Sequence, residues 1–236
     1  MQKYSIFLLA VLCLAFSNCT KEKLITLSAT SVSLHHGETY QIPAQCDDPI
    51  TYTSGDEYHA KMSASGLVRA QYVGSTSIRL SSNDDTKNFG VTVSPQSNLY
   101  PEPNIRFGES KNSVISRLGV PDVSNADGIG YSDYSANAPA LIVLFDSNNC
   151  VKVYSLMVKS ICSSELGTFL GERYVFVSSS NDAFLFINKL SASAATMMIC
   201  SELYDINYWM VMYAPYNSKD TSDFSAMKTL IKAVTE

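Results

Sequence analysis

From Leu24 to Pro95, hydrophobic and polar residues alternate in short segments that end at turn residues. A period of two is typical of strands with one face in a core, and turns about every 8 to 12 residues are typical of an all-β sandwich. Apolar residues at helical spacing do not occur in this part of the chain. The pattern predicts strands within 27–34, 39–42, 50–53, 61–70, 75–81 and 89–93, with a polar hairpin tip at 82–87.

Beyond residue 104 the pattern changes, and helical spacing appears beside alternating segments. Val114, Ile115 and Leu118 predict a short helix that Gly119 and Pro121 end. A second helix is predicted over 163–173. Strands are predicted near 130–134, 140–145, 150–158, 174–177, 183–187, 195–200 and 208–213. This order is a helix followed by a meander of strands, twice, which predicts an α+β domain with an antiparallel sheet.

The last segment of the chain has an apolar stripe of its own. Ser222 is a candidate N-cap, and one helical face behind it would carry Phe224, Met227, Leu230, Ile231 and Val234. The pattern predicts an amphipathic helix that covers a sheet.

Prolines mark the boundary between the two halves. Three of them fall within residues 94–104, where they stiffen the chain and cannot continue a sheet. The predicted organisation is therefore a β-sandwich over 24–95, a proline-rich linker over 96–104 and the α+β domain, of unknown type, over 105–236.

The N-terminus predicts export. Lys3 precedes an apolar run over 5–16, which is typical of a secretory signal peptide and too short for the roughly 20 residues that a spanning helix needs. Cys19 follows this run and resembles the lipobox cysteine of bacterial lipoproteins, although Phe16 and Asn18 depart from the usual residues. The resemblance implies that residues 1–18 are removed, that Cys19 is acylated and that 19–23 form a tether. The alternative is an ordinary signal peptide cut near Ser17, which leaves Cys19 a thiol.

Lys21, Glu22 and Lys23 follow that cysteine and resemble the surface-export signal of Bacteroidetes lipoproteins. The implied location is the outer membrane, lipid-anchored and exposed at the surface, with the periplasmic face as the alternative.

The first half resembles the bacterial immunoglobulin-like group 2 domain of surface adhesins. The resemblance rests on Ser31-Val-Ser-Leu34, Gly37-Glu-Thr39, Ile50-Thr-Tyr-Thr-Ser54, Ser65-Gly-Leu-Val68 and Val73-Gly-Ser-Thr-Ser-Ile78. The usual tryptophan of the third strand is Tyr52 here, which keeps a large side chain at that position. The family implies an extracellular module for spacing or adhesion, and it carries no catalytic residue over to this chain.

Charge and cysteine content narrow the functions further. With 17 Lys and Arg against 22 Asp and Glu, the chain has no basic excess, which argues against a nucleic-acid partner. Beyond the anchor, the cysteines are Cys46, Cys150, Cys162 and Cys200, which allow three disulfide connectivities or stay as thiols. They form no CxxC motif and the histidines lie far from them in sequence, so we expect no metal. No phosphate-binding glycine motif occurs, and we expect no cofactor.

Catalytic candidates are few. No histidine follows His59, so a serine or cysteine triad is excluded within the second half. A pair of carboxylates, as in a glycosidase, remains available there among Asp133, Asp146, Glu165, Glu172, Asp182, Glu202 and Asp205, whose ordinary role is that of solvated surface acids.

Aromatic residues give the main binding candidate, since tyrosine and tryptophan offer flat amphipathic surfaces. The candidate residues are Tyr204, Tyr208, Trp209, Tyr213 and Tyr216. Strand alternation would put Tyr208 on one face and Trp209 with Tyr213 on the other, so core packing is the competing interpretation. We expect a non-enzymatic surface lipoprotein that displays a domain for a protein or carbohydrate partner. The alternatives are a glycan-active hydrolase and a purely structural envelope component.

Overall fold

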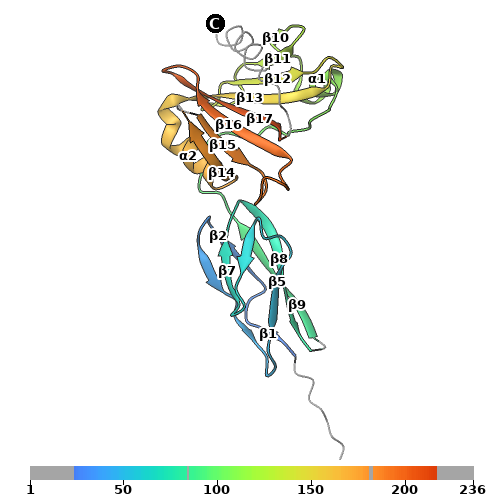
Figure 1. Ribbon diagram of the computed structural model, residues 1–236, viewed down its shortest axis with the longest axis vertical. Coiled ribbons are helices and arrows are strands. Elements are labelled where there is room, and N and C mark those ends of the chain that lie inside the picture. The colour runs from blue at the N-terminus through green and yellow to red at the C-terminus, as the bar shows by residue number, and fades with distance from the viewer. Residues whose placement is uncertain (1–23, 84, 181–182, 217–236) are drawn as a thin grey trace, which may run out of the picture.

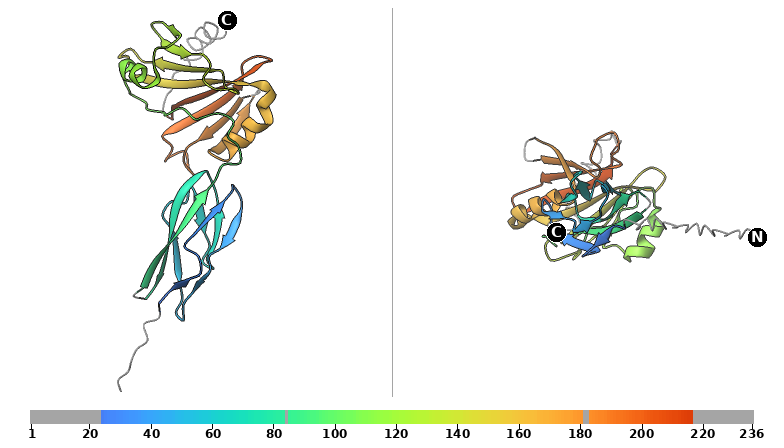
Figure 2. Two further views of the ribbon diagram at one scale, coloured as in Figure 1. Left: turned by 180° about the vertical axis from the view of Figure 1, so that it is seen from behind. Right: turned by 90° about the horizontal axis from the view of Figure 1, so that it is seen from below.

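The computed structural model describes residues 24–83, 85–180 and 183–216. The signal peptide predicted over 1–18, Cys19, the tether 19–23 and the helix predicted behind Ser222 lie outside the described residues. The described chain is mostly β and forms two bodies arranged end to end (Figure 1). Figure 2 shows the same elongated arrangement from behind.

The first body is a β-sandwich. Its larger sheet has the order β2 (Ser31–Leu34), β9 (Asp85–Val93), β8 (Gly74–Ser82) and β5 (Thr51–Ser54). Its smaller sheet has the order β3 (Thr39–Gln41), β7 (Leu67–Ala70) and β6 (Ala60–Met62), while β1 (Thr26–Leu27) pairs with β4 (Ala44–Gln45). Val68 from the smaller sheet and Ile78, Leu80 and Phe89 from the larger one are fully buried in a common core.

The all-β prediction for this half is confirmed, and three segments differ in detail. Residues 61–70 are a hairpin of β6 and β7, because Gly66 turns the chain with a φ of +83°. The polar stretch 82–87 is not all hairpin tip, since β9 begins at Asp85 and pairs with Ser82. The segment 27–34 is two strands, β1 and β2, which pair with different partners.

Gly74 starts β8 in a conformation that only glycine adopts easily. Its φ is +140°, and a Cβ built there would lie 2.2 Å from Cε1 of His59, whose ring Nδ1 is hydrogen-bonded to the carbonyl of Tyr72. We expect Gly74→Ala to lower the free energy of unfolding of the sandwich by about 2 to 3 kcal/mol, through backbone strain and overpacking. Urea unfolding followed by circular dichroism measures it.

Gly37→Ala is the matched control for that substitution. Gly37 also has a positive φ, +84°, but a Cβ there meets nothing within 4 Å. The control should lose about 1 to 2 kcal/mol, from the backbone alone. Equal losses in the two variants would contradict the close approach of His59 to Gly74.

The second body is built on one eight-stranded antiparallel sheet. Its order is β10 (Val123–Ser124), β11 (Gly128–Tyr131), β12 (Ala140–Phe145), β13 (Val151–Lys159), β17 (Tyr208–Pro215), β16 (Met197–Leu203), β15 (Ala183–Ile187) and β14 (Val175–Ser180). The helix α1 (Lys111–Leu118) precedes the first four strands, and α2 (Ser163–Gly171), entered through a 3₁₀ turn at Ser160–Cys162, precedes the last four. The predicted order of helix then meander, twice, is confirmed.

Local signals explain where α1 begins and ends. The side chain of Ser110 accepts a hydrogen bond from the backbone N–H of Ser113, which satisfies one free donor of the first turn. Gly119 ends the helix with a φ of +94°. None of the helices in the described ranges is long and apolar enough to cross a bilayer.

The two faces of the sheet carry separate apolar clusters. Both helices cover one face of the sheet, which includes Val211. The apolar cluster on this face contains Val114 of α1 and Leu166, Phe169 and Leu170 of α2. The other face gathers Ala140, Ile142, Leu144, Val153, Met157, Met210, Met212 and Ala214. The predicted alternation along 208–213 is therefore confirmed.

Candidate functional site

An apolar pocket of about 340 Å³ lies between α2 and the strands β15, β16 and β17. Its lining is Ser163, Ser164, Leu166, Gly167, Leu170, Phe184, Phe186, Ser201 and Trp209. No residue with a formal charge is among them. A concave, mostly apolar site with a few polar groups is the usual form of a binding pocket for a small molecule or a buried side chain.

The sheet wall of the pocket follows from strand register. Phe184 pairs with Ser201, and Leu203 pairs with Trp209, so these side chains belong to the face that α2 covers. The rings of Phe184 and Trp209 are 5.9 Å apart. The indole N–H of Trp209 donates a 2.8 Å hydrogen bond to Oγ of Ser163 at the start of α2, which fixes the ring between helix and sheet.

The helix wall depends on Gly167. This residue is in the interior of α2, and a Cβ built on it would meet nothing within 4 Å. A glycine in a helix interior costs about 1 kcal/mol relative to alanine. The missing side chain leaves open space beside Leu166 and Leu170, which are buried on the same helix.

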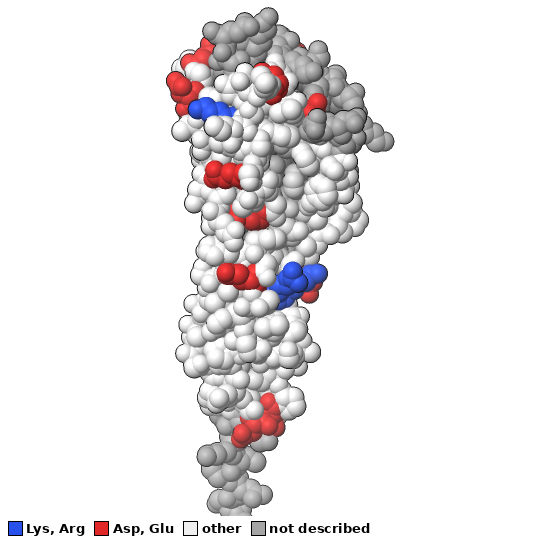
Figure 3. All heavy atoms as spheres, turned by 90° about the vertical axis from the view of Figure 1, so that its left-hand side faces the viewer, with Lys and Arg blue, Asp and Glu red and all other residues white. Residues whose placement is uncertain are grey.

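Apolar side chains stay exposed beside the pocket. Ile161 is 90% exposed and Ile206 is 87% exposed, while Leu203 is 40% exposed. The backbone N–H of Ser160 donates to the carbonyl of Asn207, and its hydroxyl donates to the carbonyl of Ile206, both at 2.7 Å. These bonds hold the turn before α2 against the β16–β17 hairpin. Most of the surface on the side where α2 lies is neither acidic nor basic (Figure 3).

The structure separates the aromatic residues that the sequence grouped. Trp209 lines the pocket. Tyr213 is fully buried, with its hydroxyl 2.9 Å from that of Tyr100. Tyr204 and Tyr208 pack against the apolar cluster on the opposite face of the sheet, and Tyr216 is half-buried after β17. The five side chains therefore do not form one surface.

Sequence reasoning missed the other residues of the pocket. These include Phe184, Phe186 and Ser201, which belong to strands. The alternating pattern of a strand does not reveal which helix covers the face of the sheet that the strand helps to form. Gly167 was the available signal, because glycine inside a predicted helix needs a packing or functional reason.

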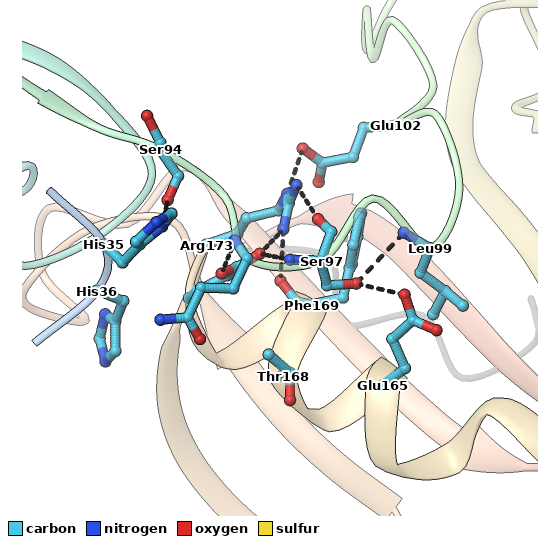
Figure 4. Close-up of polar contacts among 12 residues, drawn as sticks. His35, His36, Ser94, Ser97, Leu99, Glu102, Glu165, Thr168, Phe169 and Arg173 are labelled. Carbon is cyan, nitrogen blue, oxygen red and sulfur yellow. Dashed lines mark hydrogen bonds and ion pairs between the residues drawn. The ribbon is translucent and has the colours of Figure 1, made fainter. Parts of the chain in front are cut away.

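A polar network at the end of α2 fixes the helix to the segment that links the two bodies (Figure 4). The buried carboxylate of Glu172 accepts hydrogen bonds from the backbone N–H groups of Gln96, at 2.7 Å, and Ser97, at 3.1 Å. Arg173 pairs with Glu172 and donates to the carbonyl of Ser97 at 3.0 Å. Its guanidinium also lies 3.8 Å from the centre of the Phe169 ring.

The same end of α2 contacts the sandwich directly. The hydroxyl of Tyr58 donates to the carbonyl of Arg173 at 2.6 Å, and the N–H of Val73 donates to the carbonyl of Glu172 at 2.8 Å. Residues of the predicted linker join the second core, because Leu99 and Tyr100 are each 3% exposed. The linking segment thus packs against the second body along its length from Ser97 to Tyr100.

Two of the candidate carboxylates converge on one residue. Glu165 accepts a 3.0 Å hydrogen bond from the hydroxyl of Ser97, whose N–H donates to Glu172. Glu172 is 3% exposed and paired with Arg173, which leaves it no access to a substrate. Asp146 and Asp205 accept backbone hydrogen bonds in tight turns, and Asp182 lies outside the described residues.

No disulfide joins the four cysteines that the structure describes.

Comparison with known proteins gives only distant likenesses. No family model and no curated protein matches the chain. Domains 4–9 of the surface layer protein SbsC are 13% identical, with a TM-score of 0.28, over 83% of this chain and 27% of that one. Human protocadherin-24 EC1-2 is 16% identical, with a TM-score of 0.27, over 82% of this chain and 93% of that one. The chain spans about a quarter of the SbsC fragment, and likenesses this distant carry no argument about function.

Proposed function

We propose that the protein is a non-enzymatic, lipid-anchored protein of the bacterial outer membrane, in which an immunoglobulin-like module displays an α+β binding domain. The observation that carries this proposal is the end-to-end arrangement (Figure 1). Ile25 is hydrogen-bonded to Asp85 at the tip of the β8–β9 hairpin, whereas Val73, at the other end of β8, contacts the second body. The described chain thus starts at the end of the sandwich far from the pocket.

A lipid at Cys19 suits this geometry. Each acyl CH₂ that enters a bilayer contributes about 0.8 kcal/mol, so two or three chains hold a protein stably without a spanning helix. The sandwich would then stand between the membrane and the pocket. Because α2 is bonded to the sandwich through Tyr58 and Val73, the pocket would keep a fixed direction relative to the anchor.

The anchor is tested by metabolic labelling with a radioactive fatty acid in cells that express the full-length chain. We expect the wild-type protein to be labelled and Cys19→Ala to lose at least nine tenths of the label. Cys200→Ala, which removes a thiol of β16, is the control and should keep it. An unlabelled wild-type protein, or a labelled Cys19→Ala protein, would refute acylation at this position.

Protease treatment of intact cells tests display. We expect the full-length protein to be degraded without lysis, and protection until lysis would instead place it on the periplasmic face.

The second candidate is a glycan-active hydrolase, in which Glu165 would be the accessible acid because Glu172 is buried and paired with Arg173. Turnover of a polysaccharide that Glu165→Gln abolishes would establish it. Absence of both turnover and binding, together with copurifying envelope proteins, would favour the structural alternative.

A further inference from the structure

We propose that the pocket beside Trp209 receives an aromatic side chain of a protein partner, and prefers tyrosine to phenylalanine. This inference rests on the proposed display function and names the chemistry of its ligand. It uses four observations: the apolar lining, the open space at Gly167, the hydroxyl of Ser201 and the exposed apolar side chains beside the mouth.

The lining selects against charged ligands and sugars. The lining has no carboxylate, amide, imidazole or guanidinium group. Such planar polar side chains are the hydrogen-bond partners for the several hydroxyls of a sugar. A charged group buried there would lose its hydration without compensation. Phe184, Phe186 and Trp209 instead offer ring faces and edges, which favour another aromatic ring.

Ser201 adds one polar contact inside this apolar site. The residue is 2% exposed and lines the pocket. No side-chain hydrogen bond joins its hydroxyl to any other residue in the described part of the chain. A ligand ring that carries one hydroxyl satisfies this group, and tyrosine is the side chain with that composition.

The surroundings of the pocket favour a protein over a free small molecule. Ile161 of the 3₁₀ turn, Leu203 at the end of β16 and Ile206 of the following loop lie beside the mouth with large exposed fractions, and a small ligand inside the pocket would leave them in water. A partner protein that inserts one side chain also covers these residues and excludes water around the inserted group. Buried aromatic anchors surrounded by such contacts dominate the energetics of protein interfaces.

The single tryptophan of the chain makes the site measurable. Trp209 is the only tryptophan in 236 residues, so its fluorescence reports on this pocket alone. We would titrate the whole protein with blocked tripeptides of sequence acetyl-Ser-X-Ser-amide in which X is Tyr, Phe or Gly. We expect a saturable change in emission with Tyr, about tenfold weaker binding with Phe, and no response with Gly.

Two pairs of variants locate the binding. Gly167→Leu fills the open space and should weaken binding of the Tyr peptide by at least about tenfold. Gly171→Leu, on the same helix and with nothing within 4 Å of its Cβ, does not line the pocket and should bind as the wild type does. Ser201→Ala should abolish the preference for Tyr over Phe, whereas Ser116→Ala, on α1 and outside the pocket lining, should retain it.

Several results would overturn the inference. These are the absence of any saturable response, equal binding of the Tyr and Gly peptides, unchanged binding in Gly167→Leu, or no preference for Tyr over Phe in the wild type. Saturation by dodecyl maltoside but not by the peptides would assign the pocket to a lipid chain, and saturation by N-acetylglucosamine alone would assign it to a sugar. None of these results bears on acylation of Cys19, so failure here is distinguishable from failure of the proposed function.

Discussion

Replacing Arg173 with methionine should lower the free energy of unfolding of the second body by about 3 to 5 kcal/mol. The substitution keeps an apolar side chain over the Phe169 ring but leaves the carboxylate of Glu172, which is 3% exposed, without its cation. It also removes the donors to the carbonyls of Ser97 and Phe169. Thermal or urea unfolding of the mature protein, followed by circular dichroism, measures the loss.

Two further variants decide whether the buried charge causes that loss. Adding Glu172→Gln to Arg173→Met should recover part of the stability, because the remaining group is then neutral and still accepts hydrogen bonds from Gln96 and Ser97. Lys87→Met removes an exposed partner of Asp85 and should change stability by less than about 1 kcal/mol. The explanation fails if the double variant is less stable than Arg173→Met alone.

Raising the pH from 8 to 11 should destabilise the second body by about 4 kcal/mol. Burial raises the pKa values of Tyr100, Tyr174 and Tyr213 in the folded protein above the ordinary value near 10. Below pH 10 these phenols are neutral in both states and stability is unaffected. Above it only the unfolded chain releases their protons, so stability falls by about 1.4 kcal/mol per tyrosine at pH 11.

Urea unfolding at pH 8 and pH 11 tests this prediction, and Tyr174→Phe is the informative variant. Its phenol donates a hydrogen bond to Glu102, so the variant should be less stable at pH 8. Between pH 8 and pH 11, however, it should lose about a third less than the wild type, because one ionisable group is gone. Equal losses in both proteins would mean that Tyr174 does not contribute to the alkaline transition.

Local sequence signals predicted most of the strands and helices. The alternation along 208–213 correctly separated Trp209 from Met210, and the predicted stop at Gly119 matched the end of α1. Two strands of two residues each, β4 and β10, gave no signal because an alternating pattern needs more residues.

What the sequence could not provide was pairing over long distances. The sheet is continuous because β13 pairs with β17, about 50 residues later in the chain, and no local pattern encodes that contact. Glu172 and Arg173 likewise read as an ordinary charged pair at the end of the helix predicted over 163–173. Their burial depends on the linking segment and on Tyr58, more than 100 residues earlier. Trp209, one of the five candidate binding residues, lines the pocket, and the helix wall of that pocket depends on a packing that only the structure reveals.

The antiparallel pairing of β13 with β17 also bears on the origin of the second body. Each is the last strand of a unit made of one helix and four strands, so an approximate two-fold axis passes between them. A chain that held only one such unit would end in a strand with one unpaired edge. That edge could pair with the same strand of a second copy of the chain. The present polypeptide therefore has the architecture of a fused homodimer.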